Sequence, residues 1–377
     1  MDVKIKTSKL FFLDVIRGLA ALYVTLSHGN DWLWDANKTY NKQPKDYNQI
    51  EKIFKSGLSI FNYSHLAVMF FFVLSGFVIH LRYSKKLSTD NSFEFDYFPY
   101  VKRRFRRIFP PLLFALIFTF LMDSLGNHFL HFKIYDPEIF LKFTTHLYND
   151  SLLVFLGNMA FLMEIFIPCW GSNQALWTLS YEWWLYMLYP LFFLLNRKSF
   201  KFSWVFVFII FILFFLPKTS LISNYIYENI HLIFTWYLGV FLSDIYSKRI
   251  NISYNWLFPL AILIPINLFF PGLSKNFHVL YDTLLAVGIM GVLAFFLWLE
   301  EKEIHISFLR YFKWLGDCSY TLYVTNLPIM IFLGGYIMKY HTNSFPFNFL
   351  LYFLGCAVSI IFAYVVHFLV EKPFMRK

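Results

Sequence analysis

The chain has 377 residues, of which 58% are hydrophobic, 23% aromatic and only 15% charged. Fifty phenylalanines and apolar runs long enough to cross a bilayer exclude an ordinary soluble protein and predict an all-α, polytopic membrane protein. The net charge of +10 could suggest a nucleic-acid partner, but most of the excess lies in short loops, where the positive-inside rule explains it, so we expect none.

Ten apolar segments are predicted to cross the membrane as helices. They are residues 10–30, 62–82, 107–124, 175–195, 203–217, 229–246, 255–271, 280–299, 315–338 and 348–370. A further apolar stretch, 151–168, is ambiguous. The first run lacks a small-residue cleavage site, so we interpret it as a retained helix. With no internal repeat and no soluble segment after the last span, residues 1–377 are expected to form a single transmembrane domain.

Basic loop residues bear on the ambiguous stretch. Lysines at positions 4, 6 and 9 precede the first span, and the loop after the second span is rich in Lys and Arg, so both are expected in the cytoplasm. If 151–168 crossed the membrane, the loops around Arg197 and Lys248 and the tail at Lys377 would face outward. We therefore interpret 151–168 as re-entrant or interfacial. Ten crossings of the plasma (inner) membrane, with both termini in the cytoplasm, follow.

The first span carries two residues that are unusual in lipid, within "LDVIRGLAALYVTLSH". Arg17 would lie roughly 12 Å above the inner boundary and His28 roughly 28 Å above it, on the same helix face. A charge at this depth usually faces a cavity or a partner. Asp14, one turn earlier, could pair with Arg17. The alternative is a structural Asp14–Arg17 pair with a histidine at the outer interface.

Four arginines precede the third span, in "YVKRRFRRIFPPL". They are Arg103, Arg104, Arg106 and Arg107. Arginine binds phosphate through a planar fork, and Pro110 and Pro111 suit the first turn of a helix, whose N-terminus also favours anions. The segment therefore predicts a site for a phosphorylated cytoplasmic ligand. Lipid headgroups and simple orientation signals are the alternatives.

Two later segments also carry polar groups inside apolar runs. In "ALWTLSYEWWLYMLYP", Glu182 would lie about 10 Å below the outer surface, a depth at which it could orient His28 as a base. The alternative is a glutamate that holds two helices together. In "GDCSYTLYVTNLPIM", Tyr320, Tyr323 and Asn326 accompany small and hydroxyl residues that suit close helix packing. Three cysteines, Cys169, Cys318 and Cys356, have no metal or redox spacing, so we expect packing roles and no metal site.

In this order the segments resemble acyltransferase family 3, membrane proteins that acylate extracytoplasmic sugars and other acceptors. Arg17 and His28 match the family's arginine followed after ten residues by histidine. "FFVLSGFVI" with Ser75, the Arg-x-x-Arg of Arg104 and Arg107, "WTLSYE" with Trp177, Ser180 and Glu182, "SYTLYVTNLPI" and "LVEKPF" match its further motifs. Asn326 stands where many members have a second histidine, and asparagine cannot act as a base.

The resemblance implies a reaction and a set of roles. The donor would be cytoplasmic acyl-CoA, expected to be acetyl-CoA, used as a co-substrate without a permanently bound cofactor. The four arginines would hold its phosphates, Arg17 would steer it, and His28 would act on a hydroxyl of an extracytoplasmic or lipid-linked saccharide as general base or acyl carrier, with Glu182 orienting it. Asn326 would position a ligand, membrane lipid would surround the chain, and a second transfer step would need a separate envelope-side partner.

Two rival functions stay open on the sequence. A secondary transporter of a polar or anionic solute would use Arg17, His28 and Glu182 as translocation residues, but it would leave the cytoplasmic arginines without a specific role. A non-catalytic envelope scaffold would fit the Asn326 departure and predicts that His28→Ala leaves function intact.

Overall fold

The computed structural model describes residues 10–34, 49–90, 93–144, 146, 148–213, 229, 231–270, 277–304, 306–340 and 347–375. The N-terminal lysines, the tail residue Lys377 and the end of the predicted span 203–217 lie outside these ranges. The described residues form helices and no strand, which confirms the all-α fold class. Short 3₁₀ and π turns extend or connect several of the helices.

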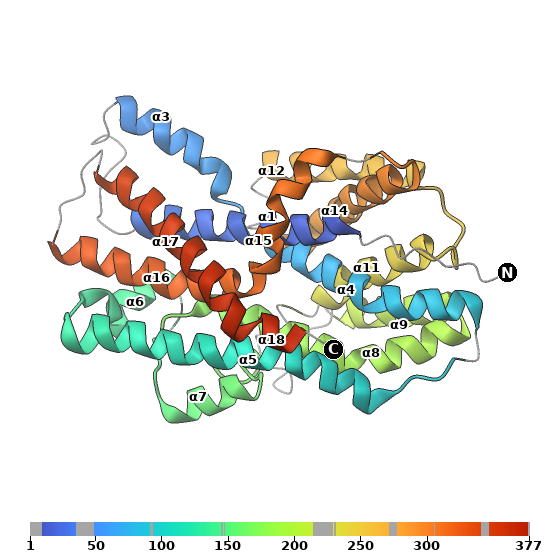
Figure 1. The fold of residues 1–377 in the computed structure, drawn as a ribbon, viewed down its shortest axis with the longest axis horizontal. Helices are drawn as coiled ribbons and strands as arrows, with labels where there is room; N and C mark the ends of the chain where they lie inside the picture. The colour runs from blue at the N-terminus through green and yellow to red at the C-terminus, as the bar shows by residue number, and fades with distance from the viewer. Residues whose placement is uncertain are drawn as a thin grey trace.

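The longer helices are α1 (Phe11–Gly29), α4 (Ser64–Thr89), α5 (Tyr97–Ser124), α8 (Trp177–Lys198), α9 (Phe200–Leu213), α11 (Leu232–Tyr246), α14 (His278–Glu301), α16 (Ser319–Tyr340) and α17 (Phe347–Val370). Short helices are α3 (Gln49–Leu58), α6 (Pro137–Thr144), α7 (Leu152–Met159), α12 (Leu263–Phe269), α15 (Lys313–Asp317) and α18 (Lys372–Met375). Figure 1 shows α5 running along one edge of the molecule and α17 crossing the others obliquely.

Within the described ranges, six helical stretches are long and apolar enough to cross a membrane, so the predicted count of about ten is not confirmed. They are Phe11–Leu33, Lys52–Thr89, Tyr97–Phe129, His278–Glu301, Ser319–Tyr340 and Phe349–Phe374. Three of the other predicted spans correspond to shorter apolar helices, Phe200–Ile212, Leu232–Tyr246 and Tyr254–Phe269, and the fourth to α8. Phe200–Ile212 is followed by residues outside the described ranges.

The ambiguous stretch 151–168 forms no membrane-length helix. Only α7 is helical in it, and turns follow as far as Pro168. Leu152 and Leu153 expose 71% and 76% of their surface, and α7 lies at the periphery beside α5 (Figure 1). Exposed leucines on a short helix suit an interfacial position, which stays a prediction.

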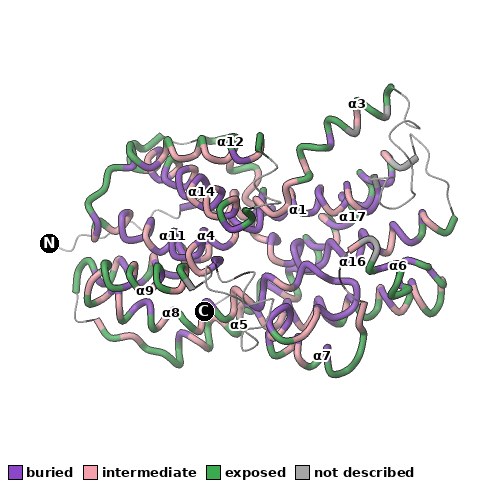
Figure 2. Tube along the Cα trace, turned by 180° about the vertical axis from the view of Figure 1, so that it is seen from behind, coloured by how far each residue is buried: buried purple, intermediate pink, exposed green. Residues whose placement is uncertain are grey.

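The core lies between α4, α11 and α16, whose buried residues occupy the middle of the molecule in Figure 2. The backbones of α4 and α11 approach so closely that a Cβ on Gly76 would lie 2.0 Å from the Trp236 carbonyl oxygen. A Cβ on Gly239 would lie 1.9 Å from the Val73 carbonyl oxygen. Such glycines are the usual means by which membrane helices pack closely.

A buried polar network joins α4, α8 and α11 at the end opposite the start of α4. Asp244 accepts hydrogen bonds from His80 Nε2 at 2.9 Å, Asn196 Nδ2 at 2.7 Å and Arg249 Nη1 at 2.6 Å. Tyr189 lies 2.9 Å from the other nitrogen of His80. Because this carboxylate has three donors, the network fixes the relative positions of helices that line the site.

Candidate functional site

A cavity of about 90 Å³ lies where α1, α4, α5, α8 and α16 meet. Most of its wall is apolar, from residues such as Val68, Phe71 and Leu179. Its polar lining comes from Arg17, Ser75, Arg104, Arg107, Thr178, Glu182, Tyr186, Ser319, Tyr320 and Tyr323. The fold thus brings together residues from four of the sequence segments that were singled out.

Arg17 is fixed at this cavity by α15 and α16. Its Nε donates to Ser319 Oγ at 2.8 Å and its Nη2 to the Gly316 carbonyl at 2.7 Å, while Asp14 lies 3.6 Å away. The Arg17 side chain can reach these partners because α1 and α15 pack closely through glycines. A Cβ on Gly18 would lie 2.5 Å from the Gly316 nitrogen. The predicted Asp14–Arg17 pair is therefore present, but it is only one part of a wider set of contacts.

The four arginines of α5 divide into two pairs. Arg104 and Arg107 line the cavity, whereas Arg103 and Arg106 are exposed. The prediction that the helix begins near Pro110 is wrong, since α5 begins at Tyr97 and both prolines lie inside it. The arginines are therefore already helical, and residues three apart share a face. Of the four arginines, Arg104 and Arg107 face the cavity, and donor binding by any of them stays a prediction.

Glu182 lies in the cavity wall and accepts a short hydrogen bond from the Tyr186 hydroxyl. Ser75 Oγ donates to the same carboxylate oxygen at 3.2 Å and accepts from Trp236 Nε1 at 3.4 Å. Arg107 adds an electrostatic interaction with Glu182. The predicted pairing of Glu182 with His28 is wrong for this structure, because helical rise gave the depth of each residue but not the direction in which Glu182 points.

His28 lies outside the cavity and is paired with Asn326. Its Nδ1 is 2.5 Å from Asn326 Oδ1. The amide nitrogen of Asn326 donates to the carbonyls of Leu322 at 2.8 Å and Tyr323 at 2.9 Å, which assigns Oδ1 to the side facing His28. An amide oxygen only accepts, so Nδ1 carries the hydrogen and Nε2 keeps its lone pair. Asn326 thus sets the tautomer of neutral His28.

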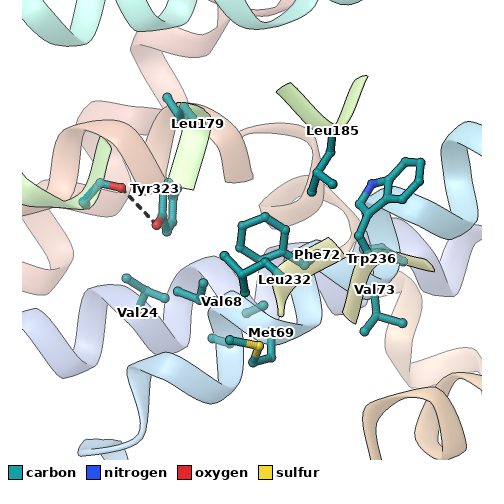
Figure 3. Close-up of a cluster of buried hydrophobic side chains, with 14 of the residues drawn as sticks. Val24, Val68, Met69, Phe72, Val73, Leu179, Leu185, Leu232, Trp236 and Tyr323 are labelled. Carbon is teal, nitrogen blue, oxygen red and sulfur yellow. Dashed lines mark hydrogen bonds between the residues drawn. The ribbon is translucent and has the colours of Figure 1, made fainter. Parts of the chain in front are cut away.

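An apolar layer, which includes part of the cavity wall, lies next to His28 on α1. Val24 of α1, one turn before His28, belongs to the same buried cluster as Val68 and Phe72 of α4 (Figure 3). Tyr323 closes the cluster from α16, where its hydroxyl lies 2.9 Å from Thr178 Oγ1. Helical rise puts His28 roughly 16 Å from Arg17 along α1.

The remaining predicted residues lie near the cavity in different roles. Tyr320 lines it, and its hydroxyl donates to the Ile108 carbonyl at 3.4 Å. Trp177 is half-buried and packs edge-on against Tyr181, with ring centroids 5.7 Å apart. Ser180 is fully buried. Among the residues described, neither Trp177 nor Ser180 lines the cavity.

Sequence reasoning missed Glu371. This buried carboxylate accepts hydrogen bonds from the Thr321 nitrogen at 3.2 Å and hydroxyl at 2.9 Å, and it interacts electrostatically with both Arg17 and Arg107. The signal was available, since Glu371 is the acidic residue of the "LVEKPF" segment. Within the described ranges, no three His, Cys, Asp or Glu side chains gather to hold a metal.

A family model described as an acyltransferase domain, that of acyltransferase family 3, matches residues 10–368. No curated protein and no solved structure matches the chain. Because the family model covers nearly the whole sequence, the chain belongs to acyltransferase family 3, whose members are membrane acyltransferases.

Proposed function

We propose that this family member transfers an acyl group, most simply acetyl, from cytoplasmic acyl-CoA to a hydroxyl of an extracytoplasmic or lipid-linked cell-envelope saccharide. The observation that carries the proposal is the convergence of Arg17, Arg104 and Arg107 on one apolar cavity. Guanidinium groups suit the phosphates of coenzyme A, and apolar walls suit its acyl and pantetheine portions.

On the donor side, Arg104 and Arg107 would bind phosphate oxygens, and Arg17 would hold the chain deeper along α1. Glu182 is held by Ser75 and Tyr186, so its role would be to orient Arg107 rather than His28. A guanidinium that faces a fixed carboxylate keeps one orientation, which lowers the entropic cost of binding a phosphate.

On the acceptor side, His28 would act as general base through Nε2. That nitrogen would take the proton of the saccharide hydroxyl as its oxygen attacks the thioester carbonyl carbon. The carbon–sulfur bond then breaks, and the CoA thiolate leaves and takes up the proton from His28. Asn326 would serve as a positioning residue, because its oxygen holds Nδ1–H.

The surroundings of the reaction follow from the same proposal. The enzyme would lie in the plasma membrane with both termini in the cytoplasm, in contact with membrane lipid. A separate envelope-side protein could receive the acyl group or present the acceptor.

Inside-out membrane vesicles test the function. Vesicles with wild-type protein or His28→Ala receive acetyl-labelled acetyl-CoA, and label on envelope glycan is followed. We expect wild-type transfer and a loss of at least 100-fold in the variant at equal protein level, since a general base typically contributes 10²–10⁴-fold. Equal transfer by both proteins would remove His28 from the reaction. No transfer by the wild type, with solute flux instead, would favour a transporter.

A further inference from the structure

A second buried polar cluster lies away from the cavity, where α4, α11 and α14 begin. Asp282 of α14 bridges two histidines: His65 Nε2 lies 2.6 Å from one carboxylate oxygen and His231 Nε2 lies 2.7 Å from the other. The side chains of Asp282 and His231 expose only 7% and 3% of their surface, whereas His65 exposes 43%. The cluster therefore presents a single imidazole to its surroundings.

The bridge fixes how that imidazole can act. A carboxylate only accepts hydrogen bonds, so Nε2 of neutral His65 carries the hydrogen and Nδ1 keeps a lone pair. Asp282 in turn cannot rotate freely, because His231 holds its second oxygen. This is the arrangement by which a carboxylate orients a histidine for contact with a hydroxyl group.

Two tyrosines neighbour the cluster in the chain: Tyr63 lies two residues before His65, and Tyr281 lies directly before Asp282. Tyr281 interacts electrostatically with Asp282 and with Tyr63. Tyr23 of α1 interacts electrostatically with both Tyr63 and Tyr281. All three tyrosine side chains are partly exposed. Phenol rings that offer a flat face and a hydroxyl suit neutral ligands rich in hydroxyl groups.

His65 of the cluster and His28 lie at about the same level along their two helices. Val24 and Val68 lie in the same apolar layer (Figure 3). His28 follows Val24 by four residues on α1, and His65 precedes Val68 by three on α4. Because these neighbouring helices are predicted to run in opposite directions through the membrane, both histidines lie about one turn outward from that layer.

We propose that His65, held by Asp282 and His231, forms with Tyr63 and Tyr281 the binding site for the saccharide acceptor on the outer side. His65 Nδ1 accepts a hydrogen bond from a sugar hydroxyl, and the tyrosines contact the ring. Asp282 and His231 are positioning residues. The inference rests on the proposed acyl transfer, for which it supplies the site of the second substrate.

The test separates acceptor binding from donor binding. Full-length protein in proteoliposomes receives saturating labelled acetyl-CoA and increasing amounts of a total envelope-glycan extract. We expect His65→Gln to raise the half-saturating amount of extract about tenfold, as the loss of one hydrogen bond implies, with an unchanged KM for acetyl-CoA. His128→Gln is the matched control, since His128 is an exposed histidine predicted on the same side.

The other outcomes are decisive as well. Asp282→Asn should shift the half-saturating amount in the same direction, and its melting temperature shows whether it folds. If His65→Gln has the same half-saturating amount of extract as the wild type, the proposed site is wrong. It is also wrong if His65→Gln weakens the binding of acetyl-CoA and of extract equally, because a merely structural role of His65 predicts that result. Wild-type protein that transfers no label would contradict the proposed function itself, whatever His65 does.

Discussion

Three charged side chains, Arg17, Arg107 and Glu371, interact electrostatically beside the cavity. Glu371 lies near both Arg17 and Arg107, and Arg17 and Arg107 also repel each other electrostatically. Two guanidinium groups in a largely buried place need a counter-charge, because desolvation and mutual repulsion would otherwise disfavour both. Glu371 supplies this charge from the end of the chain and is itself fixed by Thr321 at the start of α16.

Removal of that charge should cost stability. We expect Glu371→Gln to lower the free energy of unfolding by about 2 kcal/mol, because it removes one of the carboxylates that offset the charge of two largely buried guanidinium groups. Thr321→Val, which removes one hydrogen bond to the carboxylate, should cost about 1.5 kcal/mol. Thermal unfolding of the detergent-solubilised protein measures both, with the exposed Glu138→Gln as control. An unchanged melting temperature in Glu371→Gln would show that the arginines do not depend on it.

At the scale of an element, α5 shows how helical phase selects residues. Its arginine-rich turn continues without a break into the apolar part of the helix, past Pro110 and Pro111. Arg104 and Arg107 therefore share the face turned to the cavity, while Arg103 reaches the Tyr83 hydroxyl at 3.3 Å and Arg106 is exposed. The two pairs have the same chemistry and differ only in direction.

The two faces of α5 should differ in donor affinity. Arg107→Gln is expected to raise the KM for acetyl-CoA by 10-fold or more, since a hydrogen bond to a charged group contributes about 1.5–3 kcal/mol. Arg106→Gln is the matched control one residue away, and it should change the KM by less than about threefold. The measurement is labelled transfer in inside-out vesicles at varied acetyl-CoA concentration. Equal effects of the two substitutions would mean that charge alone, not the face, attracts the donor.

The direction in which a side chain points from its helix also explains how much of the site the sequence could predict. Motif residues such as Arg17, Ser75 and Glu182 were singled out, and they do converge on one cavity. Depth along a helix follows from residue number, but the side to which Glu182 points depends on packing with α4, so its partner was predicted incorrectly. Glu371 lies in the quoted "LVEKPF" segment, but it was not selected, because its partner Thr321 is 50 residues away in the chain and the motif alone does not indicate that contact.

At the scale of the whole molecule, the number of crossings decides which substrates reach which residues. In the part of the chain that the structure describes, six stretches have membrane-spanning length, and α8 with three shorter apolar helices accounts for the other predicted spans. Composition predicted the fold class correctly. Hydropathy alone did not give the lengths of the shorter apolar helices. The side of the loops after α8 and α11 depends on whether 151–168 crosses.

Labelling of single cysteines with a membrane-impermeant maleimide settles that point. Ser88 after the apolar part of α4, Lys248 after α11 and Glu138 in α6 are exposed, and the three native cysteines are buried. Without a crossing at 151–168, an even number of spans separates Ser88 from Lys248. We therefore expect Ser88→Cys and Lys248→Cys to react only in inside-out vesicles.

Glu138→Cys should react only from the opposite side. Reaction of Lys248→Cys from outside would instead make 151–168 a crossing and would place the loop after α8 and the C-terminus outside. Arg104 and Arg107 would stay on the cytoplasmic side in either case, since α5 precedes the stretch. His65 would likewise stay outside, but His231 and Asp282 would begin their helices in the cytoplasm. The three residues hydrogen-bond to one another, so such a result would also contradict this arrangement of α4, α11 and α14.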